Sequence, residues 1–259
     1  MTTYAAPATR LGYDHEIGFD RLVRVELRKL TDTRASRFLL IALVALTPVV
    51  SLITMFALKP ADLTYEKLID IAQAPEKFVL PALGILTMTS EWSQRTGLTT
   101  FTLVPDRRRV LLAKVCATVG LGLMVVVIVF ASAGVANLLG GLRNGNGSWA
   151  FGAGFGEITL VQLSGLVEGI AFGMALLSPA PALVLYYVVP SVWSAVDGIS
   201  GGLKSFSPWV DLNAAQSGMY TDSITAHGWV HLLSASAIWI LLPLVIGIAR
   251  ISRTEVKSG

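Results

Sequence analysis

Few side chains in this sequence could carry out chemistry, and most of them stand alone in long apolar stretches. Glu168 is the one acidic residue in an apolar segment at residues 158–177. A charge buried in a bilayer is costly, so such a residue is normally paired, protonated or exposed to a water-filled path. His227 and His231 are four residues apart, but no glutamate lies between them as in zinc proteases, and interfacial anchoring beside a tryptophan is the better interpretation. Only Glu168 and Asp197 qualify as polar groups inside the apolar segments, which disfavours an intramembrane enzyme.

No segment predicts a nucleotide site. Residues 198–205 approach a phosphate-binding loop, but Leu203 stands where that pattern needs glycine. We therefore expect no catalytic residue, no bound cofactor and no metal in this chain, and no nucleic acid partner. The single cysteine, Cys116, cannot form an internal disulfide.

The composition indicates what kind of molecule carries these residues. Of the 259 residues, 53% are hydrophobic and 14% are charged, whereas soluble domains have about 25% charged residues. This balance excludes a disordered chain, a fibrous repeat and a disulfide scaffold, and it disfavours a soluble enzyme. We predict an all-α, polytopic membrane protein.

Six transmembrane helices are predicted, because each bilayer crossing needs roughly 20 apolar residues. The second is the weakest, since it contains Pro81 and leaves Glu76 and Lys77 at its outer interface. The fifth contains Pro190, which predicts a kink or a break. Residues 1–37 form a tail with an interfacial helix, and residues 38–259 form a transmembrane domain whose spans cover about 38–58, 69–90, 110–140, 158–178, 182–200 and 229–249.

The positions of the basic residues predict the orientation of these helices. With six spans, fifteen Lys and Arg residues fall on one side and five on the other. The positive-inside rule then places both ends of the chain in the cytoplasm, with the protein in the cell inner (plasma) membrane. Lys114, near the start of the third span, is expected to extend to the lipid headgroups.

Two helical patterns accompany the spans. Residues 19–30 combine apolar residues at helical spacing with a basic stripe, which predicts an amphipathic helix on the membrane surface; the stripe is Arg21, Arg24 and Arg28. Gly165, Gly169 and Gly173 are four apart on the fourth span, a pattern that lets two helix backbones approach closely. Packing within the chain is a simpler interpretation of these glycines than a subunit interface.

The loop between the second and third spans is the most informative stretch. Ser90 could cap a short helix that begins at Glu91, Gly97 could end it, and Pro105 separates it from the next span. A structured cytoplasmic projection is therefore predicted at residues 91–103. The alternative is a solvated basic loop.

This loop resembles one in a known family. The order of Glu91, Arg95, Thr96 and Gly97, followed by Pro105 and a basic cluster, is similar to that in permease subunits of type-2 ATP-binding-cassette (ABC) exporters. The resemblance extends to the amphipathic "elbow" helix, the six spans and the long connection before the last span. No single motif is specific, and the proline-interrupted second span departs from the pattern.

The resemblance implies a function and partners. The chain would form half of an export path, with residues 91–103 as a coupling helix on a separate ATPase that holds ATP and Mg. The second half would be another copy of the chain or a similar permease, and the substrate would be hydrophobic or amphiphilic. The alternative is a membrane scaffold or assembly factor without transport. The residues expected to contact the ATPase are Glu91, Trp92, Arg95, Thr96, Gly97, Leu98 and Phe101, and Glu168 is the candidate for the transport path.

Overall fold

The computed structural model describes residues 17–93, 106–144, 147–149, 154–200, 205–221 and 224–253. All regular elements in these ranges are helices, which confirms the predicted all-α class. Within the same ranges, five helices are long and apolar enough to cross a membrane. They are α2 (Arg34–Ala57), α6 (Arg107–Asn144), α7 (Phe155–Leu176), α8 (Pro179–Ser200), and a final helix of α11 (Ala226–Ser236), a π-helical turn (Ala237–Leu241) and α12 (Leu242–Arg253).

The second predicted span consists of two helices, which corrects the single helix expected at residues 69–90. Helix α3 (Tyr65–Ala72) is capped at its C-terminus by Gln73, and α4 (Ala74–Ser93) begins at the next residue. Helix α4 is not among the five apolar helices. Glu76, in the first turn of α4, is buried and accepts a hydrogen bond from the Thr47 hydroxyl of α2; its position at the outer interface stays a prediction.

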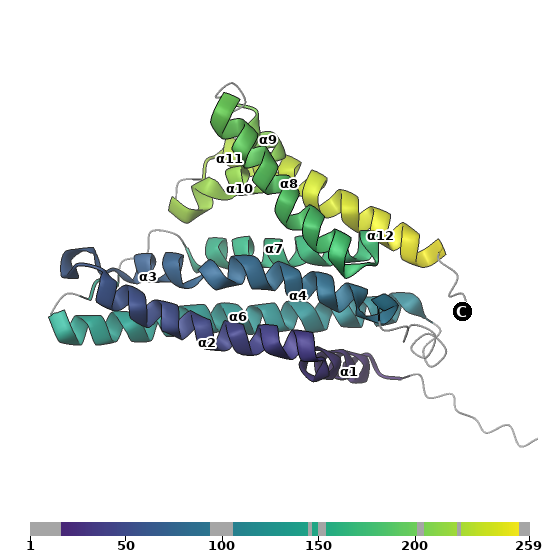
Figure 1. Ribbon diagram of the computed structural model, residues 1–259, viewed down its shortest axis with the longest axis horizontal. Helices are drawn as coiled ribbons and strands as arrows, with labels where there is room; N and C mark the ends of the chain where they lie inside the picture. The colour runs from purple at the N-terminus through teal and green to yellow at the C-terminus, as the bar shows by residue number, and fades with distance from the viewer. Residues whose placement is uncertain are drawn as a thin grey trace, which may run out of the picture.

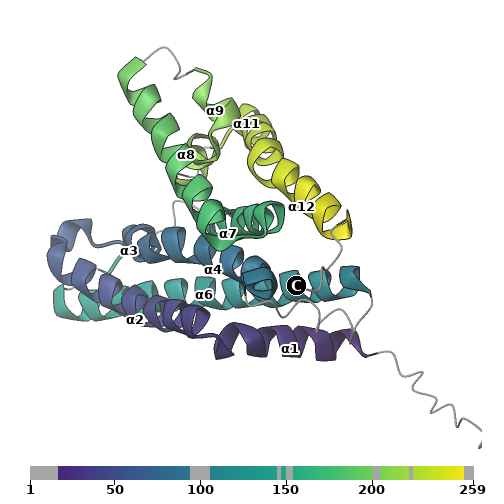
Figure 2. The same ribbon diagram turned by 45° about the vertical axis from the view of Figure 1, so that its right-hand side comes forward.

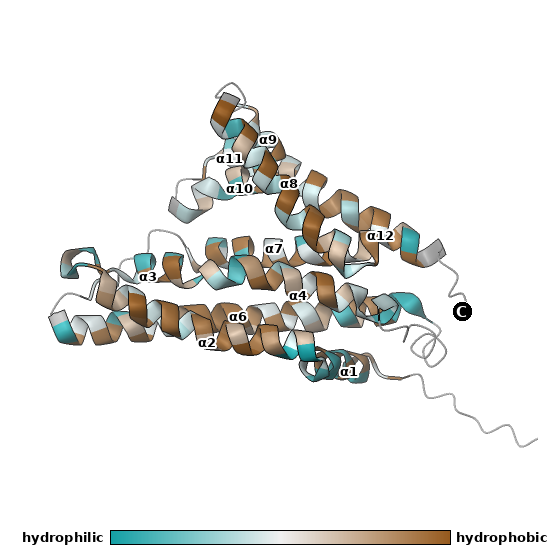
Figure 3. Cartoon of the chain, in the orientation of Figure 1, coloured by the Kyte–Doolittle hydropathy of each residue, from teal (hydrophilic) through white to brown (hydrophobic). Residues whose placement is uncertain are grey.

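The position of α4 explains its polar sequence. It packs against α2, α6, α7 and α8, and its most extensive contact is with α7. A helix enclosed by other helices needs no apolar outer face. By contrast, Figure 3 shows apolar residues along the middle of α2 and α6, with hydrophilic residues towards their ends. Hydropathy therefore identifies α2 and α6 more readily than α4, although α7, which is also largely buried, is apolar enough to be found.

Glycines bring α4 and α7 close together. A Cβ atom on Gly169 would collide with the main chain of Pro81, and one on Gly84 would lie 2.7 Å from the Leu166 carbonyl oxygen. A Cβ atom on Gly173 would lie 3.0 Å from the main-chain oxygen of Ile85. The stripe of small residues on α7 therefore faces a neighbouring helix of the same chain.

The helices form two groups that meet at α7. Helices α2, α4, α6 and α7 lie side by side along the long axis of the molecule, while α8 and α12 diverge from them (Figures 1 and 2). Helix α12 packs closely on α7, where Gly247 lies against Met174. Helix α8 continues through Pro190 without interruption, which corrects the break considered for the fifth span.

Short helices connect α8 to α11. They are α9 (Ser207–Val210), α10 (Leu212–Gln216) and a 3-10 turn (Ser217–Thr221). They lie above the bundle in Figure 1, on the far side of α7 from α1. Helix α10 packs on α11, and the 3-10 turn packs on α7, so this connection folds back over the bundle.

Helix α1 (Phe19–Asp32) matches the amphipathic helix predicted at residues 19–30. Its apolar residues Leu22 and Leu30 are buried. Thr33 alone separates it from α2, so the two helices meet at a sharp corner. The helix is confirmed, whereas its position on a membrane surface stays a prediction.

Candidate functional site

Three basic segments that are distant in sequence meet at one end of the bundle. Helix α1, the start of α6 and the end of α12 lie together there (Figures 1 and 2). Arg107 donates a hydrogen bond to the Ile251 carbonyl at 3.3 Å, and Arg109 donates one to the Ile17 carbonyl at 2.9 Å. Helix α1 also packs along α6. We call this end of the molecule the basic end.

A buried charge cluster lies at the basic end. It comprises Glu26 and Lys29 from α1, Glu91 from the end of α4, and Lys114 from the first turns of α6. The Lys114 ammonium is 3.2 Å from the Glu91 carboxylate and 3.5 Å from that of Glu26. The Lys29 ammonium is 2.6 Å from Glu26 and 3.2 Å from Glu91. Each ammonium thus bridges both carboxylates, and the cluster joins three helices.

The cluster is electrically balanced, with two acids and two bases. The side chains of Glu26 and Glu91 are each 6% exposed and that of Lys114 is 4% exposed, whereas Lys29 is 41% exposed at the rim. Burial alone lowers the pKa of Lys29, but its two carboxylate partners outweigh that effect and raise the pKa above its ordinary value. Buried ions are tolerated when they are paired in this way.

The local sequence explains how the cluster forms. Leu22, Glu26 and Leu30 are spaced four residues apart and lie on the same face of α1. Packing the two leucines therefore carries the carboxylate inward with them. Glu26 was not among the candidate site residues predicted from the sequence, although an acidic residue within an apolar stripe is a detectable signal. The expectation that Lys114 reaches the headgroups is wrong, because its ammonium is buried against Glu91.

The structure describes only two of the residues predicted to contact an ATPase. Glu91 points into the charge cluster and is not presented at the surface. Trp92 is partly buried and packs against the core, beside Arg107 and Ile251. Neither side chain is freely available to a partner. The other five predicted contacts lie outside the described residues; they are Arg95, Thr96, Gly97, Leu98 and Phe101.

The basic stripe on α1 faces outward. Arg21, Arg24 and Arg28 are all exposed. Arg24 pairs with Asp20 and Arg28 with an acid one turn further on. The hydrogen bond from Arg24 lowers the pKa of the exposed Asp20 carboxyl. These pairs lie on the surface and are screened by water, so they contribute little to holding α1 in place.

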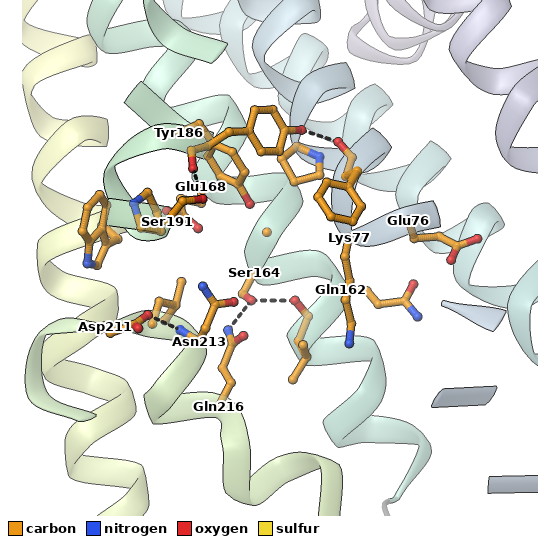
Figure 4. Close-up of a pocket in the computed structure, with 18 of the residues that line it drawn as sticks. Glu76, Lys77, Gln162, Ser164, Glu168, Tyr186, Ser191, Asp211, Asn213 and Gln216 are labelled. Carbon is orange, nitrogen blue, oxygen red and sulfur yellow. Dashed lines mark hydrogen bonds between the residues drawn. The ribbon is translucent and has the colours of Figure 1, made fainter. Parts of the chain in front are cut away.

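Glu168 lies in a different region, in a cavity of about 300 Å³ between α4, α7, α8 and α10. Figure 4 shows it near Tyr186, with Asp211 and Gln216 on the facing connection. Gly165 also lines this cavity, whereas Gly169 and Gly173 face α4 as described above. The sequence singled out Glu168, but its polar neighbours come from segments that only the fold brings together.

The two histidines contact an aromatic residue. The ring of Trp209 lies 4.4 Å from that of His231 and 5.9 Å from that of His227, between centroids. Within the described residues, no three His, Cys, Asp or Glu side chains are grouped so that they could hold a metal ion. The structure therefore places these histidines in an aromatic cluster.

Comparison with known proteins assigns no family to this chain. No protein-family model matches the sequence, and no similar curated protein is found. The function is therefore inferred from the geometry of the basic end, from the cavity and from the order of features along the chain.

Proposed function

We propose that this chain is the permease subunit of an ABC exporter and that a separate ATPase drives it. The observation that carries the proposal is the charge cluster, which ties the start of the 91–103 segment to α1 and α6 through buried ion pairs. A segment anchored on two helices can transmit a push to both. A purely solvated loop would have no need of such an attachment.

The proposed topology has six spans, with α4 as the second. Helix α4 has 20 residues, which corresponds to about 30 Å of helix, the thickness of a bilayer core. It runs alongside α2, α6 and α7 (Figure 1). With six spans, the basic end faces the cytoplasm, as the positive-inside rule favours. Helix α1 then lies on the inner surface of the plasma membrane as the elbow, with its arginines towards lipid phosphates.

The mechanism follows from these attachments. The ATPase would bind ATP and Mg, and its closure would push residues 91–103. Because Glu91 is paired with both α1 and α6, the push would move these helices together rather than bend the loop. A second copy of this chain or a similar permease would supply the other half of the path for a hydrophobic or amphiphilic substrate. Hydrolysis would take place in the partner, and this chain would not act as an enzyme.

A scaffold or assembly factor without transport is the alternative. It would share the membrane helices, but it would need neither an ATPase nor a 91–103 segment tied to two helices. Copurification separates the two functions. The full chain is purified in mild detergent from its native membrane, and bound proteins are identified. We expect a stoichiometric ATPase that carries a Walker A motif.

Two arginine variants test the contact itself. Arg95→Ala should weaken ATPase retention, because loss of a buried interfacial charge typically costs about 2–5 kcal/mol. Arg108→Ala is the matched control, since Arg108 is an exposed arginine of the same basic end and a lost rim contact costs far less. Equal loss in both variants would indicate general charge attraction, and absence of any ATPase would favour the scaffold.

A further inference from the structure

The cavity around Glu168 has an unbalanced charge. Three carboxylates line it, and they come from three different helices or their ends: Glu76 of α4, Glu168 of α7 and Asp211 at the start of α10. Lys77 is the one lysine in the lining. Its ammonium lies 4.4 Å from the centre of the Tyr220 ring, where the aromatic face stabilises it. Figure 4 shows Lys77 directed away from Glu168.

The Glu168 carboxylate in this lining lacks a donor among the described residues. Glu168 is 6% exposed, and within the described chain no hydrogen bond or ion pair reaches its carboxylate. One carboxylate oxygen of Glu76 and the side-chain oxygen of Gln162 are also buried without a hydrogen bond, but both side chains point away from Glu168 (Figure 4). Buried polar atoms are normally satisfied, and a carboxylate buried in a bilayer is normally paired with a positive group, protonated or exposed to water. The Glu168 carboxylate, which lines the cavity without a donor in the described chain, therefore calls for a ligand that donates hydrogen bonds and is positively charged.

The remaining walls are aromatic. Tyr186 and Tyr187 contribute from α8, and Trp239 contributes from the π-helical turn of the last span. The Trp239 indole donates a hydrogen bond to the Val210 carbonyl, which fixes the ring at the cavity. π-Helical turns within α-helices are frequent at functional sites. Aromatic faces bind organic ammonium groups and also accommodate apolar bodies.

We propose that this cavity binds an organic cation, namely a protonated amine with a small apolar body. The ammonium group would lie against Glu168, and the apolar body would lie between Tyr186 and Trp239. A metal ion fits less well, since the described acidic residues do not converge as a group of three on one point. A cavity of about 300 Å³ is at the small end of ligand sites, which suits a single-ring amine.

Binding to the purified full-length chain tests this site directly. Isothermal titration calorimetry in detergent would use 2-phenylethylammonium, the neutral 2-phenylethanol and the anionic phenylacetate. We expect the ammonium to bind at least tenfold more tightly than either of the other probes. Glu168→Gln should weaken ammonium binding at least tenfold, because it keeps the shape of the side chain and removes its charge.

Three further variants make the result specific. Glu157→Gln is the matched control, since Glu157 belongs to the same helix and does not line the cavity; its affinity should equal that of the wild type. Asp211→Asn preserves the α10 cap, for which both residues are suited, and should weaken binding severalfold. Gly165→Leu fills the cavity and should abolish binding. Partition of the probes into detergent is common to all variants and does not affect the comparison.

Several results would overturn the proposal. They are equal affinity in the wild type and Glu168→Gln, tighter binding of phenylacetate than of the ammonium, or loss of binding only in Gly165→Leu. If Glu168→Gln does not fold, unchanged affinity of Asp211→Asn for the ammonium would also overturn the proposal. Only the step from bound amine to exported cargo depends on the proposed function. Because this binding is measured without an ATPase, its failure and a failure of ATPase copurification are distinguishable.

Discussion

Glutamate has different roles in two regions of this molecule, the charge cluster at the basic end and the cavity beside α7. Glu91 is buried with two ammonium partners, whereas Glu168 is buried with none among the described residues. A paired buried ion contributes to structure, and removing one partner leaves an uncompensated charge. We therefore interpret Glu91 as a positioning residue for the 91–103 segment and Glu168 as a ligand-binding residue.

Glu91→Gln tests the first interpretation. The variant removes one of the negative partners of the buried Lys114 ammonium and should lower the free energy of unfolding by about 3–5 kcal/mol. The measurement is thermal or denaturant unfolding of the purified chain in detergent. Asp20→Asn, which removes an acid from an exposed ion pair on α1, should leave the transition unchanged. A Glu91→Gln variant as stable as the wild type would contradict the structural role of the cluster.

A double variant isolates the ion pair from other effects. Glu91→Gln combined with Lys114→Met should be less destabilising than the sum of the two single changes, since residues of one network are not additive. Strict additivity would mean that the 3.2 Å contact between the two side chains contributes nothing.

The sequence predicts those features that depend on residues close together in the chain, and it does not predict those that depend on distant ones. The burial of Glu168 was predictable, because the residue stands in an apolar run of its own helix. The partners of Glu91 were not, since Lys29 is 62 residues away in sequence and reaches it only when α1 packs beside α6. The inward position of Glu26 follows from its spacing on α1, but the choice of partner does not.

At the scale of helices, the contact between α4 and α7 is set by residues that lack side chains. Gly169→Ala would drive a methyl group into the Pro81 main chain, which cannot rotate away. Such overpacking typically costs about 1–3 kcal/mol, so we expect a lower unfolding temperature. Gly156→Ala is the matched control on the same helix, because nothing lies within 4 Å of its Cβ position. It should leave stability unchanged or slightly raised, and equal losses in both variants would contradict the close packing.

Helix α4 marks a limit of prediction from hydropathy. The five helices found by length and apolar composition match five of the predicted spans. Helix α4 carries Glu76, Lys77 and Glu91, because α2, α6, α7 and α8 cover it and its polar groups find partners or a cavity inside. The sequence predicted one helix at residues 69–90, but it did not predict the break at Gln73 between α3 and α4.

At the scale of the whole molecule, the proposed orientation makes a direct prediction about α4. Asp62 and Asp106 are exposed and lie on either side of it in the chain. If α4 crosses the bilayer, a cysteine at position 62 should react from outside with an impermeant thiol reagent, and a cysteine at position 106 should not. The background for both is Cys116→Ala, which removes the single native thiol. Labelling of both positions from the same side would remove the second span and the cytoplasmic placement of residues 91–103.

The overall shape was only partly predictable. Charge asymmetry in the loops indicated which segments share a side, and the three basic segments do meet at one end of the bundle (Figure 1). The cavity was not predictable, because α4, α7, α8 and α10 each supply a few of its residues and no local pattern links them. Long-range packing creates this site, whereas the basic end follows from the positions of the basic residues in the sequence.

Contact between residues 91–103 and an ATPase is the claim on which the proposed function depends most. A photoreactive amino acid placed at position 101 in the native membrane measures that contact. Position 213, which is exposed on α10, on the far side of α7 from α1, provides the control. We predict that irradiation crosslinks position 101, but not position 213, to one protein that carries a Walker A motif. A chain that crosslinks to no ATPase from position 101, or equally from both positions, would contradict the assignment as an ABC permease.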